Sequence, residues 1–127
     1  MQLLERRHRR SERIGAALTY QLEHVTNVED LYAFVLVDRN GLALATASSR
    51  TSALDVEELS ALCPLLGEGR VQREAMDAAL GNGRTAEIIT VDVGGERLYL
   101  LCVAGGRAAA VRSVLRAAPG VRRILGR

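Results

Sequence analysis

Residues 32–47 read YAFVLVDRNGLALATA, and this stretch decides the fold class of the chain. Two apolar runs flank Asp38-Arg39-Asn40-Gly41, which suits a type I turn because its glycine can adopt the left-handed conformation without steric cost. We therefore expect an antiparallel hairpin with strands at 33–37 and 42–47. Neither strand carries a charge, so we expect helices to cover both faces of the sheet.

A second hairpin is expected further along the chain, with strands at 87–93 and 96–103. Gly94-Gly95 supplies the two-residue connection that primed turns favour. Pairing outward from this turn places Asp92 opposite Arg97 on one face and apolar residues opposite each other on the other face. We interpret Asp92 and Arg97 as a surface pair rather than a catalytic one.

Helical periodicity marks the remaining segments of the chain. Ser52 is followed three residues later by Asp55, a pattern that predicts a helix cap. Pro64 is expected to kink or break the helix that follows, and Pro119 is expected to end the last long helix. The expected helices span 12–25, 53–66, 71–80 and 107–118, with a short final helix after Pro119.

This order of elements predicts an α+β fold in which an antiparallel sheet of four to five strands lies between helical layers. The 127 residues suffice for one domain with its own core. We place that single domain at 12–127. Residues 1–11 are expected to form an arginine-rich N-terminal arm.

The composition excludes several kinds of chemistry. All 17 basic residues are arginine, so a P-loop lysine and a Schiff-base lysine are both excluded. The two histidines and two cysteines lack the spacing of a zinc site. No nucleophile, base or glycine-rich phosphate motif stands out, so we expect no enzyme and no catalytic, cofactor-binding or metal-binding residues.

Two further features indicate where the protein acts. Cys63 and Cys102 lie in apolar contexts, and no secretory signal is evident, which together favour the reducing cytoplasm. No apolar run approaches the roughly 20 residues of a membrane helix, so we expect no membrane partner. The net charge of +2 and the 3% aromatic content argue against a nucleic-acid partner.

The arginine-rich arm is the feature that folding explains least. Its arginines could contact phosphates or an acidic partner, although a solvated extension is the simpler interpretation. The candidate contact residues are Arg6, Arg7, Arg9, Arg10 and Arg13.

Three sequence segments occur in the order found in the Roadblock/dynein-light-chain family. They are VLVDRNGLALA at 35–45, ALDVEELSALCPLL at 53–66 and TAEIITVDVGGERLYLLCVAGG at 85–106. Over residues 12–106 the chain resembles a bacterial Roadblock domain protein, with a Roadblock/profilin-like α/β/α arrangement. The family usually has a fifth strand, and 107–111 could supply one, although this segment has a stronger helical pattern.

The resemblance implies a small non-enzymatic domain that dimerises by pairing its third strands edge to edge while the central helices pack together. Family members serve as scaffolds and regulators, often of small Ras-like GTPases, and one bacterial member activates a polarity-controlling GTPase as a dimer. On this chain the third strand would be Thr85–Val93 and the central helix Ala53–Leu66. The dimer-interface residues implied in this way are Ala86, Ile88, Thr90, Val56, Leu59 and Cys63.

The leading hypothesis is therefore a cytoplasmic Roadblock-like protein that regulates or scaffolds a small Ras-like GTPase or a signalling complex. It would act as a homodimer or as a heterodimer with a related chain. The alternative is a profilin-like sensory module that binds a small ligand between sheet and helix, although the expected aliphatic core offers few polar groups to orient one. A third hypothesis is nucleic-acid binding through the arginine-rich arm.

Overall fold

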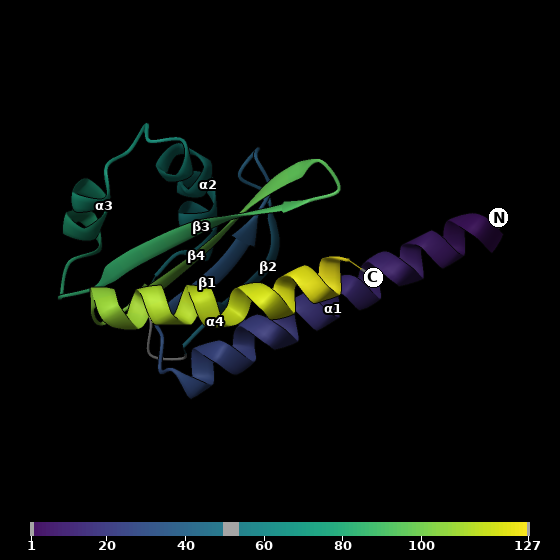
Figure 1. Cartoon of the computed structure of the whole chain (residues 1–127), viewed down its shortest axis with the longest axis horizontal. Coiled ribbons are helices and arrows are strands. Elements are labelled where there is room, and N and C mark those ends of the chain that lie inside the picture. The colour runs from purple at the N-terminus through teal and green to yellow at the C-terminus, as the bar shows by residue number, and fades with distance from the viewer. Residues whose placement is uncertain (1, 50–53, 127) are drawn as a thin grey trace.

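The computed structural model describes residues 2–49 and 54–126, with side chains from residue 12 onward. Its elements are α1 (Gln2–Val28), β1 (Ala33–Val37), β2 (Ala43–Ser48), α2 (Val56–Gly67), α3 (Arg73–Leu80), β3 (Thr85–Val93), β4 (Glu96–Ala104) and α4 (Arg107–Leu125). The four strands form one antiparallel sheet in the order β2-β1-β4-β3. Helices α1 and α4 cover one face and α2 and α3 the other, which confirms the predicted α+β fold (Figure 1).

The first hairpin forms as predicted around its turn. Asp38 organises this turn, because its Oδ1 accepts from the N–H of Asn40 at 2.8 Å and from that of Leu42 at 3.0 Å. Gly41 adopts the left-handed conformation at φ +82°, which leaves the chain free to reverse. A register shift between Leu36 and Val37 follows directly, so strand β2 starts at Ala43 rather than at Leu42.

The second hairpin confirms the predicted register. Asp92 pairs with Arg97 across the two strands, and their side chains form an exposed ion pair at 3.2 Å. Gly94 and Gly95 both have positive φ, at 58° and 82°, as a primed two-residue turn requires. Local turn chemistry therefore fixed both hairpins.

Each face of the sheet carries its own hydrophobic core. Phe34 packs in the core beneath α1 and α4, whereas Val35, the next residue along β1, packs in the core beneath α2 and α3. Strand β1 is fully buried on both faces, as expected. The same expectation is wrong for β2, where Leu44 is 38% exposed, because this edge strand is only partly covered on the α2 face.

Helix α1 is longer than its periodicity predicted. It begins at Gln2 instead of residue 12, so the backbone of the arginine-rich segment continues the helix. Figure 1 shows this part of α1 projecting beyond the end of α4 and away from the sheet. The apolar pattern placed the start of the helix late because it marks only the part that packs on the core.

Helix α2 differs from prediction at both ends. Its cap is Asp55, whose Oδ1 accepts from the N–H groups of Glu57 and Glu58 at 3.0 and 3.3 Å, while Ser52 lies outside the described residues. The predicted break at Pro64 is wrong, since the helix continues to Gly67. Pro64 removes one backbone donor but is itself buried, and packing of the helix on the sheet compensates for that loss.

Helix α4 also runs through its proline. The predicted end at Pro119 is wrong, because α4 is a single helix of 19 residues from Arg107 to Leu125. The lost hydrogen bond concerns the carbonyl of Leu115, and Leu115 is 58% exposed, so water can replace the missing donor. Residues 107–111 are helical, so within the described chain the sheet has four strands and no fifth.

Candidate protein-interaction site at the edge of strand β3

Strand β3 lies at one free edge of the sheet, with β4 as its only neighbour in the described chain. A groove of about 460 Å³ runs along this edge between the two helical layers. One wall comes from the end of α2 and the start of α3, and the other wall comes from α4. The groove is lined by Leu66, Gly67, Arg73, Ile88, Ile89, Thr90, Leu115 and Arg122.

Four charged side chains join the start of β3 to the helices on both sides, and we call this group the ionic clamp: Arg73, Asp77, Glu87 and Arg107. Glu87 is central, since its side chain is only 7% exposed and it binds Arg73 at 2.8 Å and Arg107 at 3.1 Å. Arg107 also binds Asp77 at 2.6 Å. Two carboxylates thus face two guanidinium groups, so the clamp is electrically balanced where it is buried.

The ionic clamp also holds the backbone of β3. The N–H of Ala86 donates to Oδ1 of Asp77 at 3.0 Å, and Nη1 of Arg107 donates to the carbonyl of Ala86 at 2.7 Å. The N–H of Ile88 donates to Oε1 of Glu87 at 3.3 Å. At the start of β3, backbone groups that face away from β4 are therefore already bonded within the chain.

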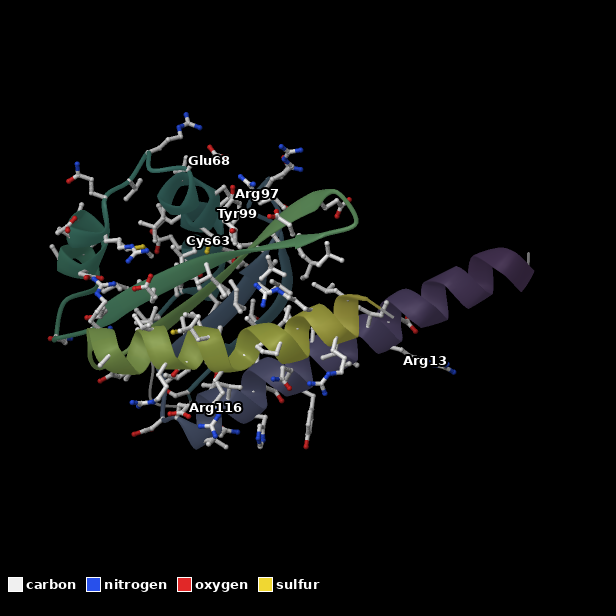
Figure 2. All side chains as sticks on the ribbon, viewed as in Figure 1. Arg13, Cys63, Glu68, Arg97, Tyr99 and Arg116 are labelled. Carbon is white, nitrogen blue, oxygen red and sulfur yellow. The ribbon has the colours of Figure 1, made fainter. Side chains whose placement is uncertain are left out.

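The six predicted interface residues lie in different environments. Thr90 is exposed at the edge, whereas Ala86 and Ile88 are 1% and 8% exposed. Leu59 and Cys63 belong to α2 and are buried, and Figure 2 shows Cys63 directed toward the sheet. Their side chains can support a dimer only by holding α2 in place.

The sixth predicted residue, Val56, lies elsewhere. It lines a separate groove of about 360 Å³ between α2 and strand β2, at the opposite edge of the sheet. The structure therefore does not bring Val56 together with Thr90 at the β3 edge.

Both cysteines are buried and have thiols of low reactivity. Burial raises the pKa of the Cys63 thiol to about 12, and burial with the nearby Glu87 charge raises the pKa of Cys102 to about 12. The thiols donate to the carbonyls of Leu59 and Ala110, each at 3.2 Å. Neither thiol has the thiolate character of a nucleophile at neutral pH.

The arginines of the predicted anionic contact remain a prediction. Arg13 is exposed on α1, and Figure 2 shows its side chain directed away from the sheet. The side chains of Arg6, Arg7, Arg9 and Arg10 lie outside the described residues, although their backbone belongs to α1.

Sequence reasoning missed the ionic clamp and Leu115. Asp77 and Arg107 are 30 residues apart, and no local pattern predicts their contact. Leu115 carried a signal, because with Val111 it widens the apolar stripe of α4 beyond the face that the core can bury. Leu115 lies outside that buried face, is 58% exposed and lines the β3 groove.

A third groove bears on the ligand-binding alternative. It measures about 350 Å³ and lies between α2 and α3, with Leu59, Leu62 and Met76 among its mainly apolar lining. Arg84 lies at this groove with its guanidinium 4.9 Å above the ring of Tyr32, and its buried Nε lacks a hydrogen-bond partner among the described residues. Asp55 and Glu58 also line this groove, so Arg84 is the group in it that could pair with an anion, among apolar and acidic neighbours.

The described residues contain neither a cluster of potential metal ligands nor a membrane-length apolar helix. Across 2–49 and 54–126, no three His, Cys, Asp or Glu side chains gather closely enough to hold a metal ion. No helix in the same part of the chain is both long and apolar enough to cross a membrane.

One helix, a hairpin, two helices, a second hairpin and a last helix follow one another along the chain, and with the two helical layers and the free β3 edge of the described sheet they define a Roadblock-like α+β domain. The fold predicted from the family resemblance is thereby confirmed.

Solved structures of this fold support the assignment. The chain is similar to Myxococcus xanthus MglB, with 16% identity over 88% of this chain and 90% of that one at a TM-score of 0.59. It is also similar to the gliding protein MglB from Thermus thermophilus, with 18% identity, coverages of 89% and 91% and a TM-score of 0.65. An MglB with a tetrameric arrangement gives 18% identity, coverages of 89% and 90% and a TM-score of 0.66. No protein-family model and no curated protein matches the sequence.

Proposed function

We propose that this protein is a non-enzymatic cytoplasmic regulator or scaffold that dimerises along β3 and acts on a small Ras-like GTPase. The observation that carries the proposal is the β3 edge, which has no further strand beside it in the described chain and has a groove of mixed polar and apolar lining along it, in a Roadblock-like fold. An unpaired strand edge is a liability in a soluble protein unless a partner or a covering element protects it. A second copy of the chain supplies such a partner by closed twofold symmetry.

The groove beside β3 suits this kind of contact. Leu115 on α4 provides a well-exposed apolar side chain on one side of the strand, whereas Leu66 on α2 is buried and lines only the base of the other wall. Burial of such surface stabilises association by about 25 cal/mol per Å² before the cost of lost freedom is subtracted. The backbone edge sets the direction of pairing, and burial of the exposed Leu115 side chain adds affinity.

The GTPase partner is inferred from the family resemblance and from the neighbouring structures. A regulator of this type acts by binding one nucleotide state of its partner more tightly than the other, which needs no catalytic residue of its own. The tetrameric arrangement of one MglB supports the capacity of this fold for self-assembly. A heterodimer with a related chain would use the same edge.

Light scattering on wild type, Thr90→Pro and Thr90→Ala tests the dimer. Thr90→Pro removes an edge N–H that faces away from β4, so the hydrogen bonds within the chain survive, whereas Thr90→Ala keeps that N–H. We expect twice the 13.7 kDa chain mass for wild type and Thr90→Ala, and a folded monomer for Thr90→Pro. A monomeric wild type at all concentrations would contradict the proposal.

The GTPase step needs a separate measurement. Small Ras-like GTPases from the same genome are loaded with GDP or a non-hydrolysable GTP analogue and titrated with the dimer. We expect at least a tenfold difference in affinity between the two nucleotide states for one of them. Equal affinities across the whole set would leave a scaffold function without GTPase regulation.

The ligand-binding alternative is favoured by one observation, the Nε of Arg84 beside the α2–α3 groove, which has no hydrogen-bond partner in the part of the chain that the structure describes. A thermal-shift screen with medium-chain carboxylates tests it. A shift seen for the wild type and lost in Arg84→Gln would support a sensory module, and no shift would argue against it.

A further inference from the structure

The ionic clamp acts on the strand edge as well as on the helices, because it occupies backbone groups that a partner strand would need. We propose that the clamp sets the register of the dimer by closing the edge at Ala86, so that the twofold axis passes through Thr90. This inference rests on the proposed β3 dimer and specifies how that same edge selects one alignment of two copies.

The direction of the backbone groups follows from observed hydrogen bonds. Ala86 and Ile88 bond Asp77, Arg107 and Glu87 through groups that face away from β4. Because backbone direction alternates along a strand, Thr90 and Asp92 also direct their N–H and C=O groups outward. The outward set is therefore Ala86, Ile88, Thr90 and Asp92.

A twofold axis restricts how this set can pair. When the twofold axis passes through one residue, each residue before it pairs with the residue equally far after it on the second copy. An axis at Ile88 would join Ala86 to Thr90 of the second copy, but both groups of Ala86 are held by the clamp at 3.0 and 2.7 Å. Registers whose twofold axis lies at Ile88 or earlier are therefore excluded, because they need the backbone groups of Ala86.

Among the remaining registers, an axis at Thr90 forms the most hydrogen bonds. It pairs Thr90 with its own copy and Ile88 with Asp92 on both sides, giving roughly six hydrogen bonds at two per pair. An axis at Ile89 or Val91 uses only two outward residues and gives roughly four. A directly opposed threonine pair is also favourable on a sheet surface.

The ionic clamp holds Ala86 by stronger hydrogen bonds than it holds Ile88. Glu87, 7% exposed on its side chain, keeps two guanidinium partners, and Ala86 is held through two charge-assisted bonds. The bond from Ile88 N–H to Glu87 is longer, at 3.3 Å. Ile88 can therefore exchange that bond for a carbonyl of the second copy while Glu87 stays paired.

Disulfide trapping reads this register directly. Thr90→Cys and Asp92→Cys, both at exposed positions, are compared in the otherwise native chain, whose own two thiols are buried. With the axis at Thr90, the Cα atoms of the two Thr90→Cys positions lie about 5.5 Å apart, within disulfide range. The two Asp92→Cys positions then lie about 14 Å apart, which no disulfide can span.

We expect Thr90→Cys to cross-link at least tenfold faster than Asp92→Cys, while the unmodified chain does not cross-link. Fast cross-linking at Asp92, or none at either position in a dimer seen by light scattering, would overturn the register and leave the proposed dimer intact. A wild type that stays monomeric would overturn the register and the dimer together.

Releasing the clamp provides the second test. The double variant Asp77→Ala/Arg107→Ala frees Ala86 yet keeps the Arg73–Glu87 ion pair, so no buried charge loses all its partners. The Ile88-centred register, also with roughly six hydrogen bonds, then competes with the first. We expect the cross-linked fraction of Thr90→Cys to fall about twofold in this background, and an unchanged fraction in a folded dimer would overturn the proposal.

Discussion

The two edges of the sheet differ in how each avoids unwanted pairing. Strand β2 is six residues long, begins beside a register shift and carries no charge, and Leu42 next to it is 67% exposed. Strand β3 is nine residues long and regular in its pairing with β4, and the ionic clamp closes only its start. Short length and irregularity discourage strand pairing, whereas a long regular edge invites it.

Exposure of apolar side chains does not by itself mark the interaction site. Leu42 is more exposed than Leu115, yet Leu42 adjoins an edge that is too short and irregular for a long ladder. Leu115 adjoins nine regular residues with a groove along them. The backbone of the edge therefore distinguishes the two sites more clearly than hydrophobicity does.

The largest effect is expected from breaking the clamp on the β3 side. Arg107→Ala leaves the buried Glu87 with one guanidinium and Asp77 with none, so we expect a loss of about 2–3 kcal/mol in the free energy of unfolding. Arg97→Ala removes the exposed pair with Asp92 on the same hairpin and should cost less than about 1 kcal/mol. Urea unfolding of both variants measures the difference, and equal losses would show that the clamp is not buried in solution.

A smaller effect separates the two edges by their exposed leucines. Leu115→Arg introduces a charge beside β3 and should raise the dimer dissociation constant at least tenfold, or about 1.4 kcal/mol. Leu42→Arg, beside β2, should leave that constant unchanged within twofold. Sedimentation equilibrium measures both, and the reverse pattern would move the interface to β2.

A substitution in the turn before β2 should change the stability of the fold and leave dimer affinity unchanged. Gly41 has φ +82°, and an added Cβ would lie 3.2 Å from the Cα of Ala61. Gly41→Ala should therefore destabilise the fold by about 1 kcal/mol through backbone strain. Dimer affinity should not change, and thermal unfolding with light scattering on one sample checks both statements.

The smallest effect concerns pH and the α1–α4 layer. The hydrogen bond from Arg116, together with the charges of Arg116 and Arg112, holds the pKa of Glu29 below its ordinary value. A lowered folded-state pKa means that this contribution to stability is present at neutral pH and is lost as pH falls below about 4. Glu29→Gln should show a shallower loss of stability between about pH 5 and 3 than the wild type in urea titrations. Parallel curves would contradict this role of the pair.

Sequence alone predicted the parts of the fold that depend on neighbouring residues. The turns at Asp38–Gly41 and at Gly94-Gly95 fixed both hairpins, and the register of Asp92 opposite Arg97 followed from the turn length. Prediction was wrong at Pro64 and Pro119, where a local rule about proline met tertiary packing that the rule does not include.

The candidate site was harder to predict, because its parts come from distant segments. The family resemblance pointed to β3, and Thr90 is indeed exposed at the edge. Leu59 and Cys63 were expected at the interface but lie in the core, since an apolar stripe on a helix does not reveal whether the chain itself or a partner covers it. The clamp joins α3, β3 and α4, a contact that only the assembled sheet creates.

The buried cysteines have a consequence for life under oxidative stress. Both sulfur atoms are shielded from solvent, and both thiols stay protonated because their pKa lies near 12. Thiolates are the nucleophiles that attack peroxide and oxidised glutathione, so sulfenic acids and mixed disulfides should not form at these buried, protonated thiols while the domain stays folded. The folded domain should therefore keep the same covalent state in reducing and in oxidising surroundings.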